Sequence, residues 1–424
     1  MKKLLVLGSD YSTAEVVKEA HNMGLYVIVS DLMNNSPTKK LADESWKIST
    51  TDVDLLTQKC KEENISAIMF GASDFNINNA REICRRLNLP IYCADDYSWK
   101  VARDKFEFKK ICKEVGAPIA QDYHLTDELK KEDIEKISFP VVIKPSDKSG
   151  NRGMSYCMSS NELSDCYKYA RSISNENIIV ERMLKGKEYN VHYVLANGEA
   201  RLLYFNSTHH QPGEKSNLYS LKITTTCHLK KYIEEVNESA KKIIQKAGCK
   251  EGIVWFDCIL DEDDNFYFLE MGYRFGGVMT YVPYSRVIGF NVIKWMLEIS
   301  IGVKHQAKHL PKELNTAIEG CAVSYHLFSK YDGEISEIKG LEELEKKENI
   351  YLDLPKRKGD LIRKDTNSGL IGVYGKNIED VCETLKYINS NFKIYDSKSN
   401  NMFIIFDDYE SLREEYYIGL REFD

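Results

Sequence analysis

Apolar and polar positions alternate along the first hundred residues in blocks of two kinds. Short, continuously apolar runs bounded by turn residues predict buried strands, and the segments between them have the spacing of amphipathic helices. Strands that alternate with helices in this way indicate a parallel, doubly wound sheet. The expected strands lie at 3–8, 25–30 and 67–70, and the expected helices at 12–23, 53–63 and 77–87.

The loop after the first strand bears on whether this unit binds a dinucleotide. Residues 8–13 supply only the first glycine, Gly8, of the G-x-G-x-x-G pattern, although Asp31 ends the second strand where a ribose-binding acid could lie. Close approach of the backbone to a pyrophosphate is therefore not provided for. NAD or FAD binding, and with it an oxidoreductase function, is not expected.

A lysine and a glycine-rich loop follow in the next part of the chain. A helix is expected at 101–115 and includes Lys105, and the apolar strand at 139–145 contains Lys144 near its end. The loop at 146–153 is rich in serine and glycine, so its backbone N–H groups can fold over phosphates with Lys144 as a fixed cation beside them. The alternative is a hairpin turn with surface charge.

Two glutamates flank the segment after the next buried strand, which is expected at 178–181. Glu181 ends that strand and could accept a hydrogen bond from an adenine amino group, while the following backbone binds the edge of the base. Glu188 could hold ribose hydroxyls. Either glutamate, taken alone, could equally be a solvated surface residue.

Two carboxylates interrupt a predicted β-hairpin whose apolar runs cover 253–260 and 266–271. Asp257 lies inside the first run and Glu270 near the end of the second, and a carboxylate buried in this way needs a positive partner. Facing one another, they could share a hard cation such as Mg²⁺. Arg274 follows and could bind an anion. Possible metal ligands and an anion-binding arginine in one segment favour phosphate chemistry. The alternative is the solvated face of an amphipathic hairpin.

The remaining segments contain less chemistry. A second charged helix is expected at 125–137, and 206–227 is the least regular stretch. It contains the adjacent histidines His209 and His210, which have no third ligand at metal spacing, so a loop is favoured over a metal site. A smaller α/β unit begins near residue 318, without an acid, histidine or cysteine constellation. It is expected to be architectural or to form an interface.

Composition narrows the class of partner. The chain has 424 residues and a net charge of −7, which argues against nucleic acid or an anionic membrane as the main ligand. No apolar run approaches the ~18 residues of a membrane span. The 11 cysteines include no C-x-x-C pair, which suits reduced thiols in a cytoplasmic protein better than disulfides or a zinc site.

The order of these motifs resembles the ATP-grasp superfamily of ligases, which includes carboxylate–amine ligases, carbamoyl-phosphate synthetase large chains and biotin carboxylases. The resemblance implies an N-terminal doubly wound α/β domain at 1–100, a central ATP-grasp domain at 101–318 with a lid roughly at 140–205, and a small C-terminal α/β domain at 319–424. The matching motifs are Asp104-Lys105, the V-V-I-K-P strand with its glycine loop, E-x-x-x-x-G-x-E at 181–188, and E-M-x-x-R at 270–274.

The resemblance also implies a role for each matching residue. The lysines would bind phosphates, the loop would close over them, and the glutamates with the backbone near Met183 would bind the nucleoside. The residues that would bind ATP in this way are Lys105, Lys144, Ser149, Gly150, Gly153, Glu181, Met183 and Glu188.

The metal and catalytic residues follow from the acidic hairpin. Asp257 and Glu270 would hold Mg²⁺, with Mn²⁺ as a possible substitute, while Arg274 and Lys144 would act in catalysis near the transferred phosphate. Many members have Asn two residues after the second acid, whereas this chain has Gly272. Whether the site would hold one ion or two is therefore left open.

The function implied is an ATP-dependent carboxylate–amine ligase that acts through an acyl phosphate on small carboxylates and amines, with a homodimer as the expected assembly. The alternatives are carboxylation or carbamoylation of the biotin-carboxylase or carbamoyl-phosphate type, and a nucleotide-binding regulatory protein without catalysis. Biotin carboxylases have a Glu-His pair shortly after the arginine, but here Arg274 is followed by F-G-G-V-M. A further substrate contact is expected of Lys222.

Overall fold

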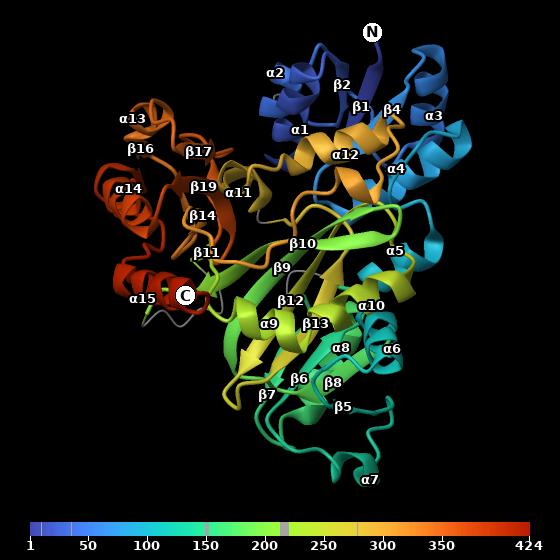
Figure 1. Cartoon of the computed structure of the whole chain (residues 1–424), viewed down its shortest axis with the longest axis vertical. Coiled ribbons are helices and arrows are strands. Elements are labelled where there is room, and N and C mark those ends of the chain that lie inside the picture. The colour runs from blue at the N-terminus through green and yellow to red at the C-terminus, as the bar shows by residue number, and fades with distance from the viewer. Residues whose placement is uncertain (10, 35, 149–151, 213–219, 278) are drawn as a thin grey trace.

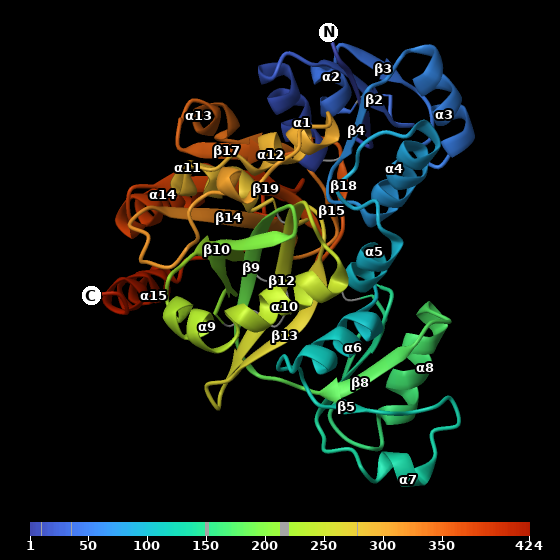
Figure 2. The same cartoon turned by 45° about the vertical axis from the view of Figure 1, so that its right-hand side comes forward.

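The computed structural model describes residues 1–424 apart from 10, 35, 149–151, 213–219 and 278. An N-terminal unit lies at one end, a small antiparallel sheet projects at the other, and a long sheet between them runs into the C-terminal part of the chain (Figure 1; Figure 2). Among the described helices, none has the length and apolar character that crossing a bilayer requires.

The N-terminal sheet contains, among the described residues, four parallel strands in the order β3-β2-β1-β4. Its central strand is fully buried from Leu4 to Leu7, because helices lie on either side of the sheet (Figure 1). The predicted doubly wound sheet is therefore confirmed. The elements are β1 (Lys3–Leu7), α1 (Tyr11–Asn22), β2 (Tyr26–Ser30), α2 (Pro37–Leu41), β3 (Glu44–Trp46), α3 (Val53–Glu62), β4 (Ala67–Phe70) and α4 (Asp74–Leu87).

A short helical link leads to the next unit, and the helix predicted at 101–115 is broken there. Asp104 ends one helix and caps the next, since its carboxylate accepts a hydrogen bond from the Phe106 N–H at 2.8 Å. This cap places Lys105 at the first helical position, where its own N–H donates to the Ser146 carbonyl at 2.9 Å. The two helices are α5 (Asp96–Arg103) and α6 (Lys105–Val115).

The small sheet is antiparallel and has the order β5-β8-β6-β7 within the described residues. It has its own apolar core, in which Val141 and Ile143 contact Leu163 and Tyr167 of the helix that covers it. The helix predicted at 125–137 is wrong over most of its length, because only one turn forms there. The elements are β5 (Asp122–Tyr123), α7 (Lys131–Ile134), β6 (Val141–Pro145), β7 (Ser155–Cys157), α8 (Leu163–Ile173) and β8 (Ile178–Arg182).

The long sheet has eight described strands in the order β13-β12-β9-β10-β11-β14-β19-β17, and all neighbours are antiparallel. Residues 206–227, predicted as irregular, contribute strand residues up to His209 and again from Leu221. The strands are β9 (Gly186–Ala196), β10 (Glu199–His209), β11 (Leu221–Thr224), β12 (Gly252–Asp261), β13 (Phe266–Gly272), β14 (Cys321–Phe328), β17 (Ile350–Asp353) and β19 (Asn367–Gly375).

Helices fix the sheet to the other parts of the molecule. Helix α12 packs against both β12 and α1, so it holds the N-terminal unit on the long sheet. The long sheet continues through β14 and β19, so its strands come from both sides of the domain boundary predicted at 318. That boundary stays a prediction. The helices are α9 (Leu229–Glu235), α10 (Asn237–Ala247), α11 (Tyr281–Ile288), α12 (Val292–Ser300), α13 (Leu341–Glu345), α14 (Ile378–Asn391) and α15 (Tyr409–Arg421).

The short strands of the C-terminal part form two separate pairs, and its last helix returns to the long sheet. In α15, a Cβ atom added at Gly419 would lie 2.5 Å from the Cys227 nitrogen and 2.7 Å from the Thr226 carbonyl carbon. Helix and chain therefore meet backbone to backbone, which only glycine permits. The pairs are β15 (Gly333–Glu334) with β18 (Leu361–Ile362), and β16 (Glu337–Lys339) with β20 (Lys393–Tyr395).

Candidate active site

A cavity of about 310 Å³ lies between the small sheet and the long sheet. Both walls contain charged side chains, and most of the predicted site residues line it. Ser149 and Gly150 lie outside the described residues. The predicted residues that line the cavity are Lys105, Lys144, Glu181, Met183, Glu188, Asp257 and Glu270, and Lys222 lines it as well.

The two hairpin acids lie directly opposite one another on β12 and β13, as the sequence predicts. A break in the register follows Asp257, and Asn190 of β9 donates a hydrogen bond to the Asp257 carboxylate at 2.7 Å. Burial and the neighbouring Glu270 charge raise the pKa of Asp257, although Lys222 at 3.8 Å acts in the opposite direction. The acid pair is therefore short of positive charge, which is the environment of a cation site.

Glu270 has the closer cation of the two acids. Lys105 Nζ lies 2.7 Å from its carboxylate and also donates to the Lys148 carbonyl at 3.0 Å. Burial alone would raise the pKa of Glu270, but the positive charges led by Lys105 lower it below its usual value. Lys105 thus connects the acid pair with the loop after Lys144.

Glu181 is deeply buried, at 5% exposure, between two ammonium groups. Lys144 Nζ lies 2.5 Å from one carboxylate oxygen and Lys109 Nζ lies 2.7 Å from the other. Burial would raise the pKa of Glu181, but these two lysines lower it below its usual value. Both oxygens are occupied, so an adenine amino group would compete with a lysine for Glu181.

Lys109 was missed by the sequence reasoning. It is 4% exposed and also binds Asp122 at 2.6 Å, so it joins α6 to β5 and β8 of the small sheet. The available signal was its spacing, because it follows Lys105 by four residues and therefore lies on the same face of α6. The two lysines on this helical face pair with three acids on strands, namely Asp122, Glu181 and Glu270.

Met183 and Glu188, which are predicted to bind the nucleoside, both line the cavity. The Met183 N–H donates to the Pro140 carbonyl at 3.1 Å, so while that bond holds only the carbonyl of Met183 is available to a base. Glu188 is exposed at the rim of the cavity. Burial together with the Glu188 charge raises the pKa of Tyr156, which places that glutamate opposite the small sheet.

Gly153 ends the described part of the glycine loop and lies outside the described lining residues. Its φ is +77°, and a Cβ atom there would lie 2.9 Å from Pro145 Cγ. The backbone therefore folds closely over the end of β6, beyond Lys144. Closure of this loop over a triphosphate stays a prediction.

Arg274 lies next to the acid pair but outside the described residues that line the cavity. Its guanidinium forms an ion pair with Asp74 at the start of α4, donates to the Phe275 carbonyl at 2.8 Å, and lies 5.3 Å from the centre of the Trp255 ring. The N-terminal unit thus positions this arginine through Asp74. Asp74 gave no sequence signal, because the pair spans 200 residues.

Known proteins resemble this chain in sequence and in fold. Residues 104–308 match the family model described as the carbamoyl-phosphate synthase L chain, ATP binding domain. This part of the chain is therefore similar to an ATP-binding domain.

Relatives and solved structures extend the similarity around the ATP-grasp domain. The α subunit of mitochondrial methylcrotonoyl-CoA carboxylase from Rattus norvegicus is 24% identical over 328 residues, which cover 71% of this chain and 44% of that protein. The chain thus spans less than half the length of this relative.

Two solved structures share the fold at low sequence identity. An L-amino acid ligase from Bacillus licheniformis superposes with a TM-score of 0.77 at 17% identity, covering 94% of this chain and 99% of that one. The biotin carboxylase domain dimer of Hydrogenobacter thermophilus 2-oxoglutarate carboxylase, in complex with MgADP, ADP and bicarbonate, has a TM-score of 0.77 at 17% identity and coverages of 93% and 91%. The ATP-grasp fold is therefore confirmed.

Gly272 departs from the ATP-grasp pattern for a visible steric reason. A Cβ atom at this position would lie 2.1 Å from Cε2 of Trp255, whose indole covers the glycine. Trp255 precedes Asp257 by two residues, so it lies on the same face of β12. The indole therefore fills the space that a side chain at position 272 would need, and the predicted ligands on this hairpin are the two acids.

We expect Lys109→Met to lower the unfolding free energy by about 3–5 kcal/mol, because it leaves Glu181 and Asp122 without a buried cation. The control is Lys113→Met on the same helix, since Lys113 is 62% exposed and binds the other oxygen of Asp122 at 2.7 Å. That change should cost less than about 1 kcal/mol. Urea titration followed by circular dichroism measures both, and equal effects would contradict the assigned burial.

We expect Gly272→Ala to destabilise the hairpin by about 1–3 kcal/mol, since the added methyl overlaps the indole of Trp255. Gly277→Ala is the control, because its Cβ would meet none of the described atoms within 4 Å. The same urea titration compares the two variants. A Gly272→Ala protein as stable as the control would show that Trp255 does not occupy this space.

Proposed function

We propose that this protein is an ATP-dependent ligase that joins a small carboxylate to an amine through an acyl phosphate and releases ADP and phosphate. The observation that carries the proposal is the cavity in which Asp257 and Glu270 face Lys105 and Lys144 between the two sheets. An ATP-grasp domain with these four side chains in one cavity has the cations and carboxylates that phosphoryl transfer needs.

The lysines would bind the phosphates by exchanging partners. In the structure Lys105 is paired with Glu270 and Lys144 with Glu181, so their charges are balanced without a nucleotide. Phosphate oxygens entering the cavity would compete for both ammonium groups. Glu188 at the rim would then meet the ribose, and the backbone at Met183 the base.

Asp257 and Glu270 fit a hard divalent cation. Their carboxylates lie opposite one another, and the raised pKa of Asp257 reflects burial beside a second acid. We propose Mg²⁺ here, with Mn²⁺ as a substitute, as the ion that neutralises phosphate charge during transfer. Gly272 adds no ligand, so the protein would hold the ion through these two acids. The MgADP complex of the biotin carboxylase neighbour supports this assignment.

Arg274 would stabilise the acyl phosphate. A carboxylate oxygen of the first substrate attacks the γ-phosphorus, and ADP leaves. The amine nitrogen of the second substrate then attacks the acyl carbon, phosphate leaves, and the amine loses a proton. Arg274 is held by Asp74 and stacked on Trp255 close to Glu270, so its charge is fixed beside the transferred group.

Amide formation is favoured over carboxylation by the residues after Arg274. Phe275 and two glycines stand where the resemblance places the Glu-His pair of biotin carboxylases. The L-amino acid ligase, which is matched over 99% of its length, supports the same choice. We also propose a homodimer, since the biotin carboxylase neighbour is a dimer, and a cytoplasmic location, since all 11 cysteines are free thiols.

We expect Glu270→Gln to lower the rate of ATP turnover at least about 100-fold while the far-ultraviolet circular dichroism is unchanged, because one metal-binding charge is lost. Glu262→Gln is the control, since Glu262 is exposed in the turn of the same hairpin. That variant should turn over ATP like the wild type. Full activity of Glu270→Gln would remove Glu270 from the metal site.

The reaction is tested by phosphate release from Mg²⁺-ATP with amino acids and small carboxylates, singly and in pairs. ADP and phosphate that appear with a particular acid–amine pair, together with the amide detected by mass spectrometry, are the expected result. Turnover that depends on bicarbonate instead would indicate carboxylation. AMP and pyrophosphate would refute the acyl phosphate, and ATP binding without turnover under every condition would favour a regulatory protein.

A further inference from the structure

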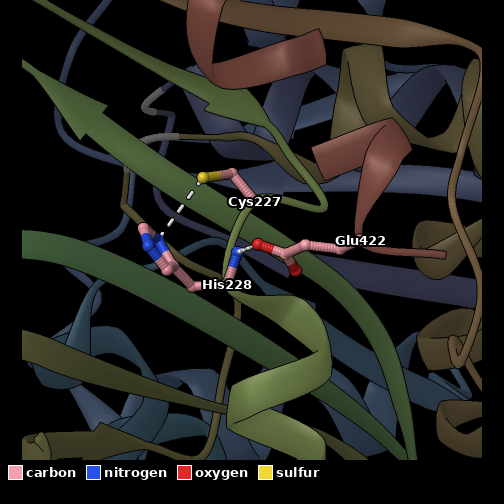
Figure 3. Close-up of side chains that lie close together, drawn as sticks. All are labelled: Cys227, His228 and Glu422. Carbon is pink, nitrogen blue, oxygen red and sulfur yellow. Dashed lines mark hydrogen bonds between the residues drawn. The ribbon is translucent and has the colours of Figure 1, made fainter. Parts of the chain in front are cut away.

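A second group of metal-ligating side chains lies on the opposite side of β9 from the acid pair. Cys227 and His228 occupy the link between β11 and α9, and Glu422 follows α15 at the end of the chain (Figure 3). One ligand atom from each of the three residues lies within 4.8 Å of the other two. The three therefore converge from two segments that are far apart in the sequence.

The backbone holds these groups in place. Cys227 Sγ lies 3.4 Å from His228 Nδ1, and a Glu422 oxygen accepts from the His228 N–H at 2.7 Å (Figure 3). The close approach of Gly419 to the Cys227 nitrogen fixes α15 against the same link. Little rearrangement separates the three side chains from a common centre.

The hydrogen bonding of the cluster is incomplete. The second Glu422 oxygen is buried and has no hydrogen-bond partner among the described residues. The Tyr189 hydroxyl lies 2.7 Å from His228 Nδ1, so both it and the Cys227 thiol face one ring nitrogen. A single nitrogen can accept only one of the two protons, and a cation would use the unpartnered oxygen and the thiolate together.

We propose that Cys227, His228 and Glu422 bind one borderline-soft divalent cation of the Zn²⁺ class, which pins α15 to the start of α9. Thiolate, imidazole and carboxylate are the ligands that Zn²⁺ takes, and in a tetrahedral site their donor atoms stand about 3.2–3.8 Å apart. Cys227 Sγ and His228 Nδ1, which are 3.4 Å apart, already lie within that range. The Cys227 thiol would lose its proton on binding. The resulting thiolate and the Glu422 carboxylate would then balance the two positive charges of the ion.

One ligand of the cluster faces a cavity. Glu422, together with Phe423 and Asp424, lines a cavity of about 430 Å³ beside the cluster.

The site would give the C-terminal helix a specific attachment to the ATP-binding sheet. Tyr189 contacts His228 and stands between Glu188 and Asn190 on β9, whose side chains point to the active-site face. The ion would therefore lie directly behind the strand that lines the ATP cavity. This inference does not depend on the ligase reaction.

The test uses the full-length protein without a histidine tag, stripped with a chelator and titrated with Co²⁺ as a spectroscopic probe. We expect a thiolate-to-Co²⁺ charge-transfer band that saturates at one equivalent and disappears when Zn²⁺ is added. Zn²⁺ should also raise the melting temperature. Absence of a thiolate band in the wild type would overturn the proposal.

Variants assign the ligands. Cys227→Ser should abolish the band, and Glu422→Gln should weaken Co²⁺ binding at least about 10-fold. Cys166→Ser is the control, because Cys166 is the partly exposed cysteine and lies in α8 of the small sheet, so it should leave the band unchanged. If Cys227→Ser fails to fold, Glu422→Gln decides alone, and undiminished Co²⁺ affinity in that variant would overturn the proposal.

Discussion

The arrangement of this molecule depends on charge balance inside the cavity between its two sheets. Glu181 is buried and the acid pair Asp257 and Glu270 is partly buried in the cavity wall, and each acid has a cation that another element supplies. Helix α6 supplies two of these cations. Lys105 and Lys109 lie one turn apart on it, and Lys105 pairs with Glu270 of the long sheet while Lys109 pairs with Glu181 of the small sheet. The position of α6 is therefore fixed by electrostatics as well as by packing.

This balance explains why the nucleotide-free cavity is stable and still able to bind an anion. Lys144 and Lys105 are each paired with a carboxylate, so neither of these two ammonium groups is buried without a counter-charge. A polyphosphate that enters with its own divalent cation brings both signs of charge. It can take the lysines while the cation takes Asp257 and Glu270, so the exchange leaves no uncompensated charge behind.

The sequence predicted the features that have local signals. Asp257 and Glu270 interrupt apolar strand patterns, and Lys144 stands near the end of one, so their positions on the sheets could be expected. The parallel N-terminal sheet followed from the same periodicity. Hydrophobic spacing at 125–137 was misleading, since only residues 131–134 became a helix, and the strand residues up to His209 had too few apolar positions to be recognised.

Contacts between distant segments had no such signal. The spacing of Lys109 places it on the same helical face as Lys105, but in a charged helix it looks like a surface lysine. Its burial depends on strands that pair only after folding. Asp74 reaches Arg274 across 200 residues for the same reason. Its position in the first turn of α4, directly after the N-cap Ser73, is explained locally by the helix dipole, which gives no indication that it also pairs with Arg274.

The packing of Trp255 against Gly272 connects these long-range contacts with the acid pair. Trp255 covers the glycine, and Arg274 lies 5.3 Å from the centre of the same ring. The stack restrains the guanidinium by a cation–π contact on one side and by Asp74 on the other. Asp74 and the indole together therefore fix a positive charge beside Glu270, next to a position where Gly272 adds no side chain.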